Sequence, residues 1–309
     1  MHIKEFSVYG FGKHFKNKVL PSLKRFKKIK ITNIISRKKN DKNFRIVKKL
    51  NKKNSTEYIY ISTPISIHNI NIKEAIKTNK VKVIISEKSL TNSKYKTWQI
   101  IQQCKKNKIL LFESFMYKYH PQFLKIKKLI LNIHDSNKNE IFFCRYSIPK
   151  IDIKDHRNNN RLTGGEIYEI GCYPISIIYF LFKIDKLKLK KITNIKNIKK
   201  GNKQLIYFKL NKLKFILSWG YNSVYRNRII FKSNNHKIIG EKIFGKRIND
   251  NIKIKFNNKK SEKEFEFNNP DNFYFMFKYF FSLENNYKNR HDMYKEINKI
   301  AELIDFFKI

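Results

Sequence analysis

Cysteine is scarce in this 309-residue chain, and its pattern excludes two structural classes. The three cysteines, Cys104, Cys144 and Cys172, are odd in number and form no CxxC or CxxxC pair. A disulfide scaffold needs a denser, even set, and a structural zinc site needs cysteines or histidines at short spacing. No cluster of His, Cys and carboxylate residues has the spacing of metal ligands. We therefore expect reduced thiols and no bound metal.

Long apolar runs are also missing. No hydrophobic stretch reaches the length of about 18 residues that suggests a membrane-spanning helix. No secretory signal precedes the first strand-like segment, residues 3–12. The apolar fraction of 41% and the aromatic fraction of 15% are still enough to build the cores of two ordinary domains. We expect a folded cytoplasmic protein without a membrane partner.

Acidic residues are few, and so are arginines. Asp and Glu number 24 against 68 Lys and Arg, a formal net charge of +44, yet only ten of the basic residues are arginine. The 58 lysines are spread along the whole chain together with asparagine and isoleucine, whose codons are equally rich in A and T. A biased genome therefore explains the charge, and we expect a solvated basic surface and no specific nucleic acid partner. Nucleic-acid binding stays as the minority hypothesis, which predicts association at physiological salt with a steep salt dependence.

The first third of the chain alternates short apolar segments with lysine-rich amphipathic ones. This alternation is typical of βαβ units that build a parallel sheet. Strands are expected at 5–12, 29–36, 57–62, 81–86 and 108–115, and helices at 16–26, 43–53, 65–79 and 93–107. The order predicts an α/β fold with a doubly wound parallel sheet of the Rossmann type.

The pattern changes near Tyr117. After a helix over 116–133, strand-like segments succeed one another with turn residues between them, as in a mostly antiparallel sheet. They lie at 140–148, 191–198, 203–210, 214–222, 227–233, 236–242, 251–258 and 263–268, with helices at 166–182, 272–286 and 293–307. The sequence therefore predicts a Rossmann domain over residues 1–117 and an α+β domain over residues 118–309. A cleft between two such domains would be the natural ligand site.

A glycine turn follows the first expected strand, in YGFGKHF at residues 9–15. Gly10 allows a tight strand-to-helix turn, and Gly12 lets the backbone approach a pyrophosphate at the positive end of the next helix. Phe15 stands where the dinucleotide fingerprint has its third glycine. Two glycines also fit an ordinary βα turn, but their place on the first strand of an alternating βα half favours a dinucleotide site.

The second expected strand ends in Ser36, Arg37, Lys38 and Lys39, with no carboxylate before Asp41. NAD-binding folds usually place an acid at this corner to bind the ribose hydroxyls, whereas a hydroxyl and cations suit a 2′-phosphate. The segment favours NADP. An ordinary basic loop competes strongly for the two lysines, but Arg37 is harder to dismiss because arginine is scarce here.

Glu87 and Lys88 follow the fourth expected strand. They would project from the carboxyl end of the sheet, where open α/β folds bind ligands. A lysine held there places a positive charge beside a reacting carbonyl or hydroxyl and lowers the pKa of a neighbouring acid. A single lysine among so many is more often a solvated surface group, so only its position distinguishes Lys88.

A nearly uncharged segment, residues 166–182, carries two ionisable groups four residues apart, Glu169 and Tyr173. On a helix such residues share a face, although Gly171 and Pro174 predict a break or kink. Taken alone, the pair would be a tyrosine with an ordinary buried partner and a glutamate near a helix start.

Together these motifs resemble the Gfo/Idh/MocA oxidoreductases. The resemblance rests on GFGKHFKNKVLPSL, ISTPISIH, EKSLT, FESFMYKYHPQF and GGEIYEIGCYPIS, which follow in this order between residues 10 and 176. It implies an enzyme that transfers a hydride between a nicotinamide and a carbonyl or hydroxyl of a sugar, sugar nucleotide or cyclitol. It also implies a homo-oligomer.

Carried over by position, the resemblance implies roles for individual residues. The cofactor would be bound by Gly10, Phe11, Gly12, Ser36, Arg37, Lys38, Thr63, Pro64, His68, Glu87 and Lys88. Lys88 would be the catalytic lysine and Tyr173 the proton donor. The substrate would be bound by Glu169, Tyr173, His120 and Arg157, with a structural role for His120 equally open.

The chain departs from the family's pattern at Phe15, Ser89, Glu166 and Glu169, where the resemblance places glycine, proline, glycine and aspartate. None of these changes removes a functional group that the chemistry requires. We therefore expect NADPH-dependent keto reduction of a sugar-type substrate, with NAD as the other candidate cofactor. The alternative is a non-catalytic dinucleotide-binding or sensor protein of the same fold.

Overall fold

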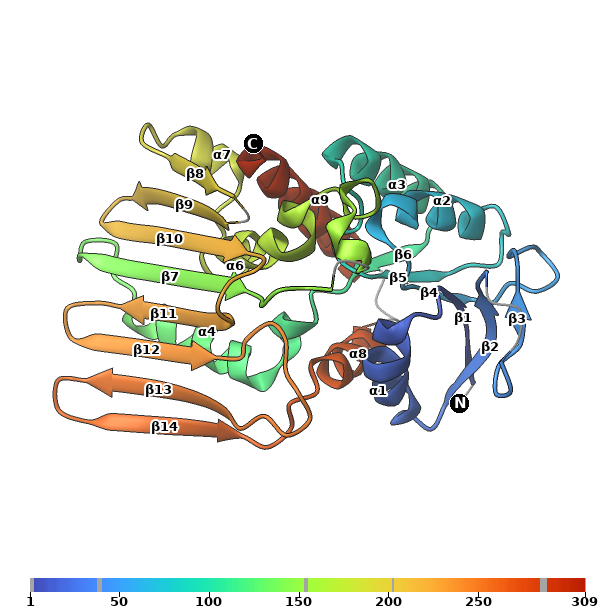
Figure 1. Ribbon diagram of the computed structural model, residues 1–309, viewed down its shortest axis with the longest axis horizontal. Helices are drawn as coiled ribbons and strands as arrows, with labels where there is room; N and C mark the ends of the chain where they lie inside the picture. Colours follow the sequence, from blue (N-terminus) through green and yellow to red (C-terminus); the bar gives the residue numbers. More distant parts are fainter. Residues whose placement is uncertain (1–2, 38–40, 153–154, 202, 284–287, 309) are drawn as a thin grey trace. The chain divides into compact units, whose positions relative to one another are not determined.

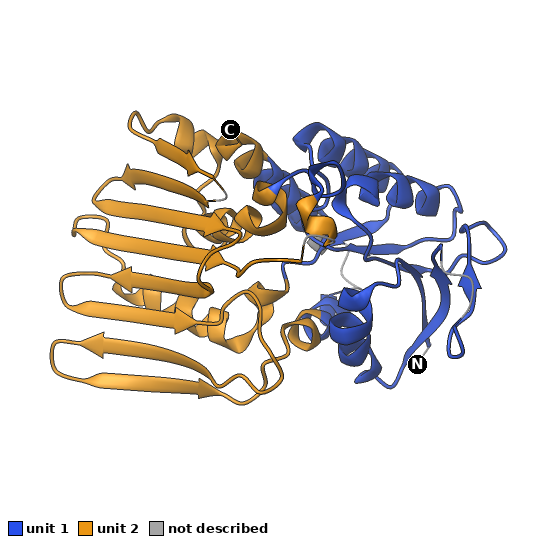
Figure 2. Ribbon diagram, viewed as in Figure 1, with its two compact units in different colours: residues 1–115, 159–165, 277–301 blue, residues 116–158, 166–276, 302–309 orange. Residues whose placement is uncertain are grey.

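The computed structural model describes residues 3–37, 41–152, 155–201, 203–283 and 288–308 (Figure 1). The chain divides into two compact units (Figure 2). Unit 1 comprises Met1–Phe115, Asn159–Gly165 and Phe277–Ala301, and unit 2 comprises Met116–Asn158, Glu166–Met276 and Glu302–Ile309. Each unit therefore combines segments that are far apart in the sequence. The division into domains over residues 1–117 and 118–309 stays a prediction.

Unit 1 is built on a parallel sheet. In the described part of the chain this sheet has six strands in the order β3-β2-β1-β4-β5-β6. They are β1 (Lys4–Tyr9), β2 (Ile29–Ile35), β3 (Ile46–Val47), β4 (Tyr58–Ile61), β5 (Val83–Ser86) and β6 (Leu110–Glu113), and each neighbouring pair is parallel. This is the strand order of a doubly wound dinucleotide-binding fold, so the predicted Rossmann sheet is confirmed.

Helices cover both faces of this sheet because its strands bury both sets of alternating side chains (Figure 1). One face packs on α2 (Ile65–Ile76), α3 (Lys94–Lys106) and the first part of α9 (Lys288–Phe307) in a core that includes Ile59 and Ile61. The other face includes Tyr60, whose ring lies 6.0 Å from the rings of both Phe15 and Phe277. The elements that supply this second layer are α1 (Leu20–Lys24), the π-helix before it (Phe15–Val19) and the end of α8 (Asn272–Leu283).

The prediction of a helix over residues 43–53 is wrong. This segment contributes the short strand β3 and then a turn. Its backbone pairs with β2, where the Ile34 N–H donates to the Arg45 carbonyl at 2.9 Å. The amide side chains of Asn51 and Asn54 each accept a hydrogen bond from the other residue's backbone N–H. Asparagine side chains that bond nearby backbone compete with a helix in this way.

Unit 2 is built on a larger sheet. Counted over the described residues, it has eight strands in the order β14-β13-β12-β11-β7-β10-β9-β8. They are β7 (Glu140–Ser147), β8 (Lys196–Lys200), β9 (Lys203–Leu210), β10 (Leu213–Gly220), β11 (Arg226–Lys232), β12 (His236–Glu241), β13 (Ile252–Asn258) and β14 (Glu262–Phe267). The β7–β10 pair is parallel and the other pairs are antiparallel. The predicted, mostly antiparallel sheet is confirmed.

The longer helices of unit 2, α4 (Pro121–Ile133) and α6 (Cys172–Phe182), lie on one face of this sheet (Figure 1). Alternation along β7 fits this arrangement, since Phe142 and Cys144 are buried while Ile141 is exposed. The remaining short elements are α5 (Asn160–Thr163, in unit 1), α7 (Lys186–Lys190), the π-helix Ile167–Gly171 and the 3-10 turns Met116–Tyr119 and His156–Asn158.

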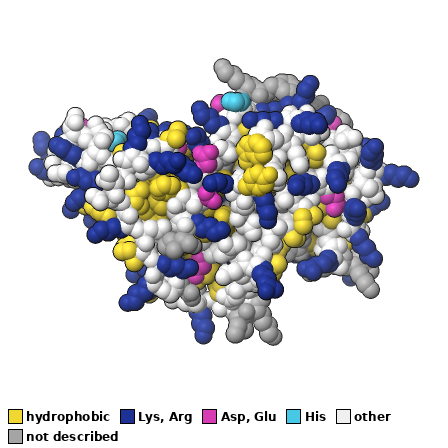
Figure 3. Space-filling view, turned by 90° about the horizontal axis from the view of Figure 1, so that it is seen from above, with side chains coloured by type: hydrophobic (Ala, Val, Ile, Leu, Met, Phe, Trp, Pro, Cys, Tyr) yellow, Lys and Arg dark blue, Asp and Glu magenta, His cyan; other side chains and the backbone are white. Residues whose placement is uncertain are grey.

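Lysine and arginine side chains are scattered over the face of the molecule seen in Figure 3, between patches of apolar side chains. Within the described ranges, none of the helices combines the length and the apolar character needed to cross a membrane. The expected homo-oligomer and the cytoplasmic location stay predictions.

Candidate active site

The glycine turn at the end of β1 places two glycines under different constraints. Gly10 has a φ of +92°, and a Cβ there would lie 2.5 Å from the Ser62 carbonyl oxygen. Only glycine therefore fits at position 10, because the neighbouring backbone leaves no room for a Cβ. A Cβ on Gly12 would meet no atom within 4 Å. This open space, at the start of the helical segment 13–24, is what the close approach of a pyrophosphate to a helix N-terminus requires.

Phe15 fills the position of the missing third glycine without closing this space. Its side chain is fully buried, and its ring lies 6.2 Å from Phe11 and 6.0 Å from Tyr60. The helix adopts the wider π form over Phe15–Val19 before it continues as α1. A large side chain is thus accommodated between the helix and the sheet, and the backbone at Gly12 remains accessible.

The corner after β2 carries the residues predicted to bind a 2′-phosphate. The Ser36 N–H donates to the Val47 carbonyl at 3.1 Å, which fixes the backbone at this corner. Arg37 is exposed, and its guanidinium has no ion-pair partner among the residues that the structure describes. The predicted Lys38 lies outside the described residues. Asp41, the first carboxylate after the corner, lies 3.9 Å from Lys16 Nζ.

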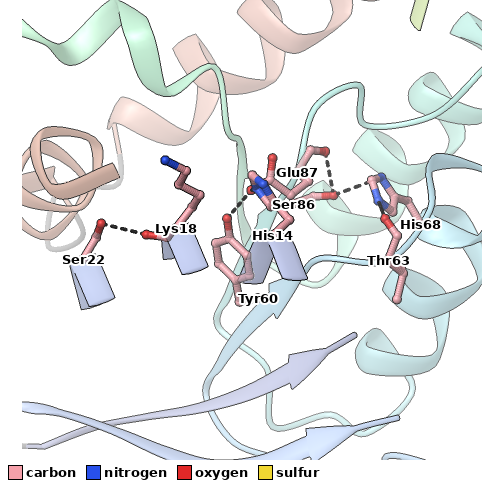
Figure 4. A network of polar contacts seen from close by, with 8 residues as sticks. All are labelled: His14, Lys18, Ser22, Tyr60, Thr63, His68, Ser86 and Glu87. Carbon is pink, nitrogen blue, oxygen red and sulfur yellow. Dashed lines mark hydrogen bonds and ion pairs between the residues drawn. The ribbon is translucent and has the colours of Figure 1, made fainter. Parts of the chain in front are cut away.

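Glu87, at the carboxyl end of β5, is held by residues of two other elements (Figure 4). Its Oε1 accepts hydrogen bonds from the Tyr60 hydroxyl of β4 at 2.5 Å and from His14 Nε2 at 3.1 Å. Its own N–H donates to the Ile61 carbonyl at 2.9 Å. The carboxylate therefore connects the first helix to the carboxyl ends of β4 and β5.

The charges in this network favour an ion pair. Burial disfavours the carboxylate of Glu87, but His14, the Tyr60 hydroxyl and Lys88 outweigh it and lower the pKa of Glu87. Partial desolvation of the half-exposed ring also opposes a charge on His14, yet the attraction of Glu87 is larger in sum and raises the His14 pKa. Burial and the nearby carboxylate raise the pKa of Tyr60, so its hydroxyl keeps the proton that it donates.

His68 connects the Thr63 loop to the segment after Lys88. It is fully buried on α2, with Nε2 2.7 Å from the Thr63 carbonyl and Nδ1 3.2 Å from the carbonyls of Ser89 and Leu90. Burial lowers the pKa of His68 despite these carbonyls, so the shortest contact assigns the proton of the neutral ring to Nε2. Its position is that of a residue that orients two loops.

The loop around Lys88 has further anchors. The Leu90 N–H donates to Glu113 Oε1 at 2.7 Å. Pro64 precedes the first residue of α2 as its N-cap. Lys88, Thr63 and Pro64 thus belong to segments whose backbones are fixed by α2, β5 and β6.

In unit 2, the segment that carries Glu169 and Tyr173 is helical but not uniform. A π-helix over Ile167–Gly171 leads into α6, so the expected break falls at Gly171. A Cβ on Gly171 would lie 2.6 Å from the indole of Trp219, which is 2% exposed on β10. Glycine is needed here because the helix backbone packs directly on this ring.

Tyr173 lies in an aromatic cluster of unit 2. Its ring centroid is 5.0 Å from Tyr146 and from Phe244, and 5.9 Å from Tyr117. The Tyr117 hydroxyl and Ser176 Oγ are 2.8 Å apart, and Ser176 donates to the Tyr173 carbonyl at 3.0 Å. With 6% exposure, the Tyr173 side chain is held by packing on three sides.

Arg157 is committed to a neighbouring carboxylate. Its Nε and Nη2 donate to the two oxygens of Asp155 at 2.9 and 2.6 Å, and these bonds lower the Asp155 pKa to about 2. Its hydrogen bonds to Asp155, with smaller electrostatic contributions from Asp155, Tyr221 and Glu169, raise the pKa of Arg157. A joint substrate contact by Arg157 and Glu169 stays a prediction.

His120 has a structural position. It caps α4, accepting a hydrogen bond from the Gln122 N–H at 3.0 Å, while its Nε2 donates to the Asn269 carbonyl at 2.7 Å. Both ring nitrogens are therefore used within unit 2. A substrate contact by His120 stays a prediction.

Sequence reasoning missed His14 and Tyr60, the two donors to Glu87. His14 stands in the YGFGKHF motif, where only its neighbouring glycines signalled a role. Tyr60 is one of several apolar or aromatic residues of β4 and carries no signal of its own. Among the described residues no group of three or more His, Cys, Asp or Glu is arranged to hold a metal ion.

No family model matches the chain. Its sequence is 26% identical over 125 residues to dTDP-3,4-didehydro-2,6-dideoxy-alpha-D-glucose 3-reductase of Actinomadura kijaniata. The aligned segment covers 40% of this chain and 36% of that protein. It is 25% identical over 122 residues to D-xylose 1-dehydrogenase (NADP(+)) 2 of Haloferax volcanii, covering 40% and 37%. The matched segment thus spans little more than a third of the length of these curated relatives.

The fold is similar to that of KijD10, a 3-ketoreductase from Actinomadura kijaniata solved in complex with NADP and TDP-benzene. The TM-score is 0.84 over 98% of this chain and 96% of that chain, at 16% identity. KijD10 variants with one tyrosine or one lysine replaced match with TM-scores of 0.84 and 0.80. At this identity the likeness concerns the fold. The resemblance to Gfo/Idh/MocA-type oxidoreductases that the motifs predict is confirmed.

Proposed function

We propose that the protein is an oxidoreductase that uses NADPH to reduce a keto group of a sugar, sugar nucleotide or cyclitol. The observation that carries the proposal is the position of Gly12 and Lys88, which follow β1 and β5 at the carboxyl edge of one parallel sheet. Open α/β folds bind ligands at this edge. The sequence relatives, a reductase of a dTDP sugar and an NADP(+)-dependent xylose dehydrogenase, support the same classes of substrate and cofactor.

The cofactor would be held by unit 1. The open backbone at Gly12 and the positive N-terminal end of the following helical segment suit the pyrophosphate. Ser36 and the exposed Arg37 suit a 2′-phosphate, and we assign the same role to Lys38. We assign Thr63 and Pro64 to the nicotinamide side, with His68 as the residue that orients their loop.

A bound NADPH would supply the hydride. We assign to Tyr173 the proton that the keto oxygen gains as it becomes a hydroxyl, and to Lys88 the positive charge that lowers the tyrosine pKa from its free value of about 10. Glu87, fixed by Tyr60 and His14, holds the backbone from which Lys88 extends. Glu169 and Arg157 are assigned to the substrate.

Changing Tyr173 to Phe tests the assignment of the proton donor. We expect the rate of NADPH-dependent keto-sugar reduction to fall by about 10²- to 10⁴-fold, because general acid catalysis typically contributes that much. The affinity for NADPH should stay unchanged. The measurement is steady-state turnover together with a cofactor titration. Tyr179→Phe, on the same helix but only partly buried, is the matched control and should keep full turnover.

Unaltered turnover in Tyr173→Phe would remove this residue from the mechanism. Tight binding of NADPH by the wild-type protein, with no turnover across keto-sugars and polyols, would favour the cofactor sensor over the enzyme. That result would leave the cofactor assignments in unit 1 intact.

A further inference from the structure

His14 occupies an unusual place in unit 1. It follows Gly12 by two residues in the first turn of the helical segment 13–24, where backbone N–H groups lack intrahelical partners. From there its ring reaches Glu87 Oε1 at 3.1 Å, and its side chain is 48% exposed (Figure 4). One histidine therefore connects the open glycine turn with the residue next to Lys88.

The groups around this imidazole oppose one another. Glu87 attracts a proton to His14, whereas the positive charges of Lys88 and Lys18 repel it. The positive end of the helix also disfavours a cation in its first turn. Tyr60 donates to the same oxygen of Glu87 and so weakens the hold of that oxygen on His14. A dianion bound nearby would act in the same direction as the Glu87 carboxylate and favour protonation of His14.

We propose that His14 links binding of the dinucleotide to uptake of a proton. The protonated fraction of the imidazole increases when the pyrophosphate binds at Gly12, and the cation then lies between two anions, the pyrophosphate and Glu87. The inference rests on the proposed function, since it needs a dinucleotide at the glycine turn. His14 acts here as a positioning residue, because the charged ring fixes Glu87 and with it the start of the Lys88 loop.

The linkage has a measurable size. If the pyrophosphate raises the His14 pKa by about one unit, binding takes up at most about half a proton, and affinity falls by up to about tenfold as pH rises through both pKa values. NADPH itself titrates, because a phosphate monoester has a second pKa of about 6. NADH has no such group and separates the protein's proton from the ligand's.

The test is isothermal titration calorimetry of the full chain with NADPH and with NADH. Each titration is run in buffers of different ionisation enthalpy between about pH 6.5 and 8.5, and the protons taken up are read from the buffer dependence. The wild type should take up a fraction of a proton with both ligands. His14→Gln keeps a donor to Glu87 but cannot titrate, so its uptake should fall by that fraction. His291→Gln, an exposed histidine of the same unit, should behave like the wild type.

A second variant gives the effect a direction. Lys18→Gln removes one of the charges that oppose protonation of His14, so the pH of greatest uptake should move upward. Equal proton uptake in the wild type and in folded His14→Gln would overturn the inference while leaving the cofactor site intact. Failure of the wild type to bind either dinucleotide would instead overturn the proposed function.

Discussion

At the scale of single residues, His120 is a buried base whose surroundings oppose its charge. Burial, with a smaller contribution from Lys246, lowers its pKa to about 3. Between about pH 6.5 and 3 the unfolded chain therefore binds a proton here that the folded chain does not, so this residue lowers stability as pH falls.

His120→Asn removes this titration and keeps a side-chain acceptor at the start of α4. We expect the variant's free energy of unfolding to decrease less steeply below about pH 6.5, by up to about 1.4 kcal/mol per pH unit. Urea denaturation at several pH values measures how the free energy of unfolding depends on pH in the wild type and in the variant. The comparison of these two slopes does not require equal stabilities. Parallel slopes for wild type and variant would show that His120 titrates normally in the folded chain.

Candidate site residues could be predicted from the sequence where they directly follow an expected strand. Gly12, Glu87 and Lys88 follow strands whose order was evident, and the carboxyl ends of parallel strands share one edge. His14 and Tyr60 were not predictable as partners of Glu87, because their meeting depends on the tilt of the first helix and on which face of β4 its tyrosine occupies.

At the scale of elements, the π-helix before α6 depends on its contact with β10. Gly171→Ala would place a Cβ 2.6 Å from the indole of Trp219, a rigid and buried ring. We expect a loss of stability of about 1–3 kcal/mol, as for other overpacked cores, seen as a lower midpoint of thermal or urea unfolding. Gly245→Ala, in the same unit, where a Cβ would lie 3.7 Å from its nearest atom, the Tyr146 hydroxyl oxygen, is the control and should cost less. Equal losses of stability in both variants would mean that the Trp219 indole shifts to accommodate the added methyl group.

Helices with a clear apolar period were predictable, and irregular ones were not. The expected helices at 65–79 and 93–107 appear as α2 and α3. The segment 43–53 has charged residues around few apolar ones, and its asparagines bond the local backbone instead of allowing a helix. The π form of Phe15–Val19 accompanies a buried ring between helix and sheet, a contact that no local pattern encodes.

At the scale of the whole molecule, composition and architecture carry different information. The lysines that dominate the net charge are distributed over the surface seen in Figure 3 and identify no single patch. The alternation of apolar segments predicted both sheets, whereas the parallel β7–β10 pair within the second sheet could not be derived from strands that follow one another in sequence.

The central claim is that unit 1 binds NADPH at the glycine turn and the Arg37 corner. The most direct measurement is a fluorescence titration with NADPH and with NADH, for the wild type, Arg37→Ala and the control Arg25→Ala, an exposed arginine after α1. We predict tighter binding of NADPH than of NADH, and a loss of about 10- to 100-fold in NADPH affinity for Arg37→Ala alone, because a charged hydrogen bond to the 2′-phosphate is removed. Absence of binding by either cofactor to the wild-type protein would contradict the account.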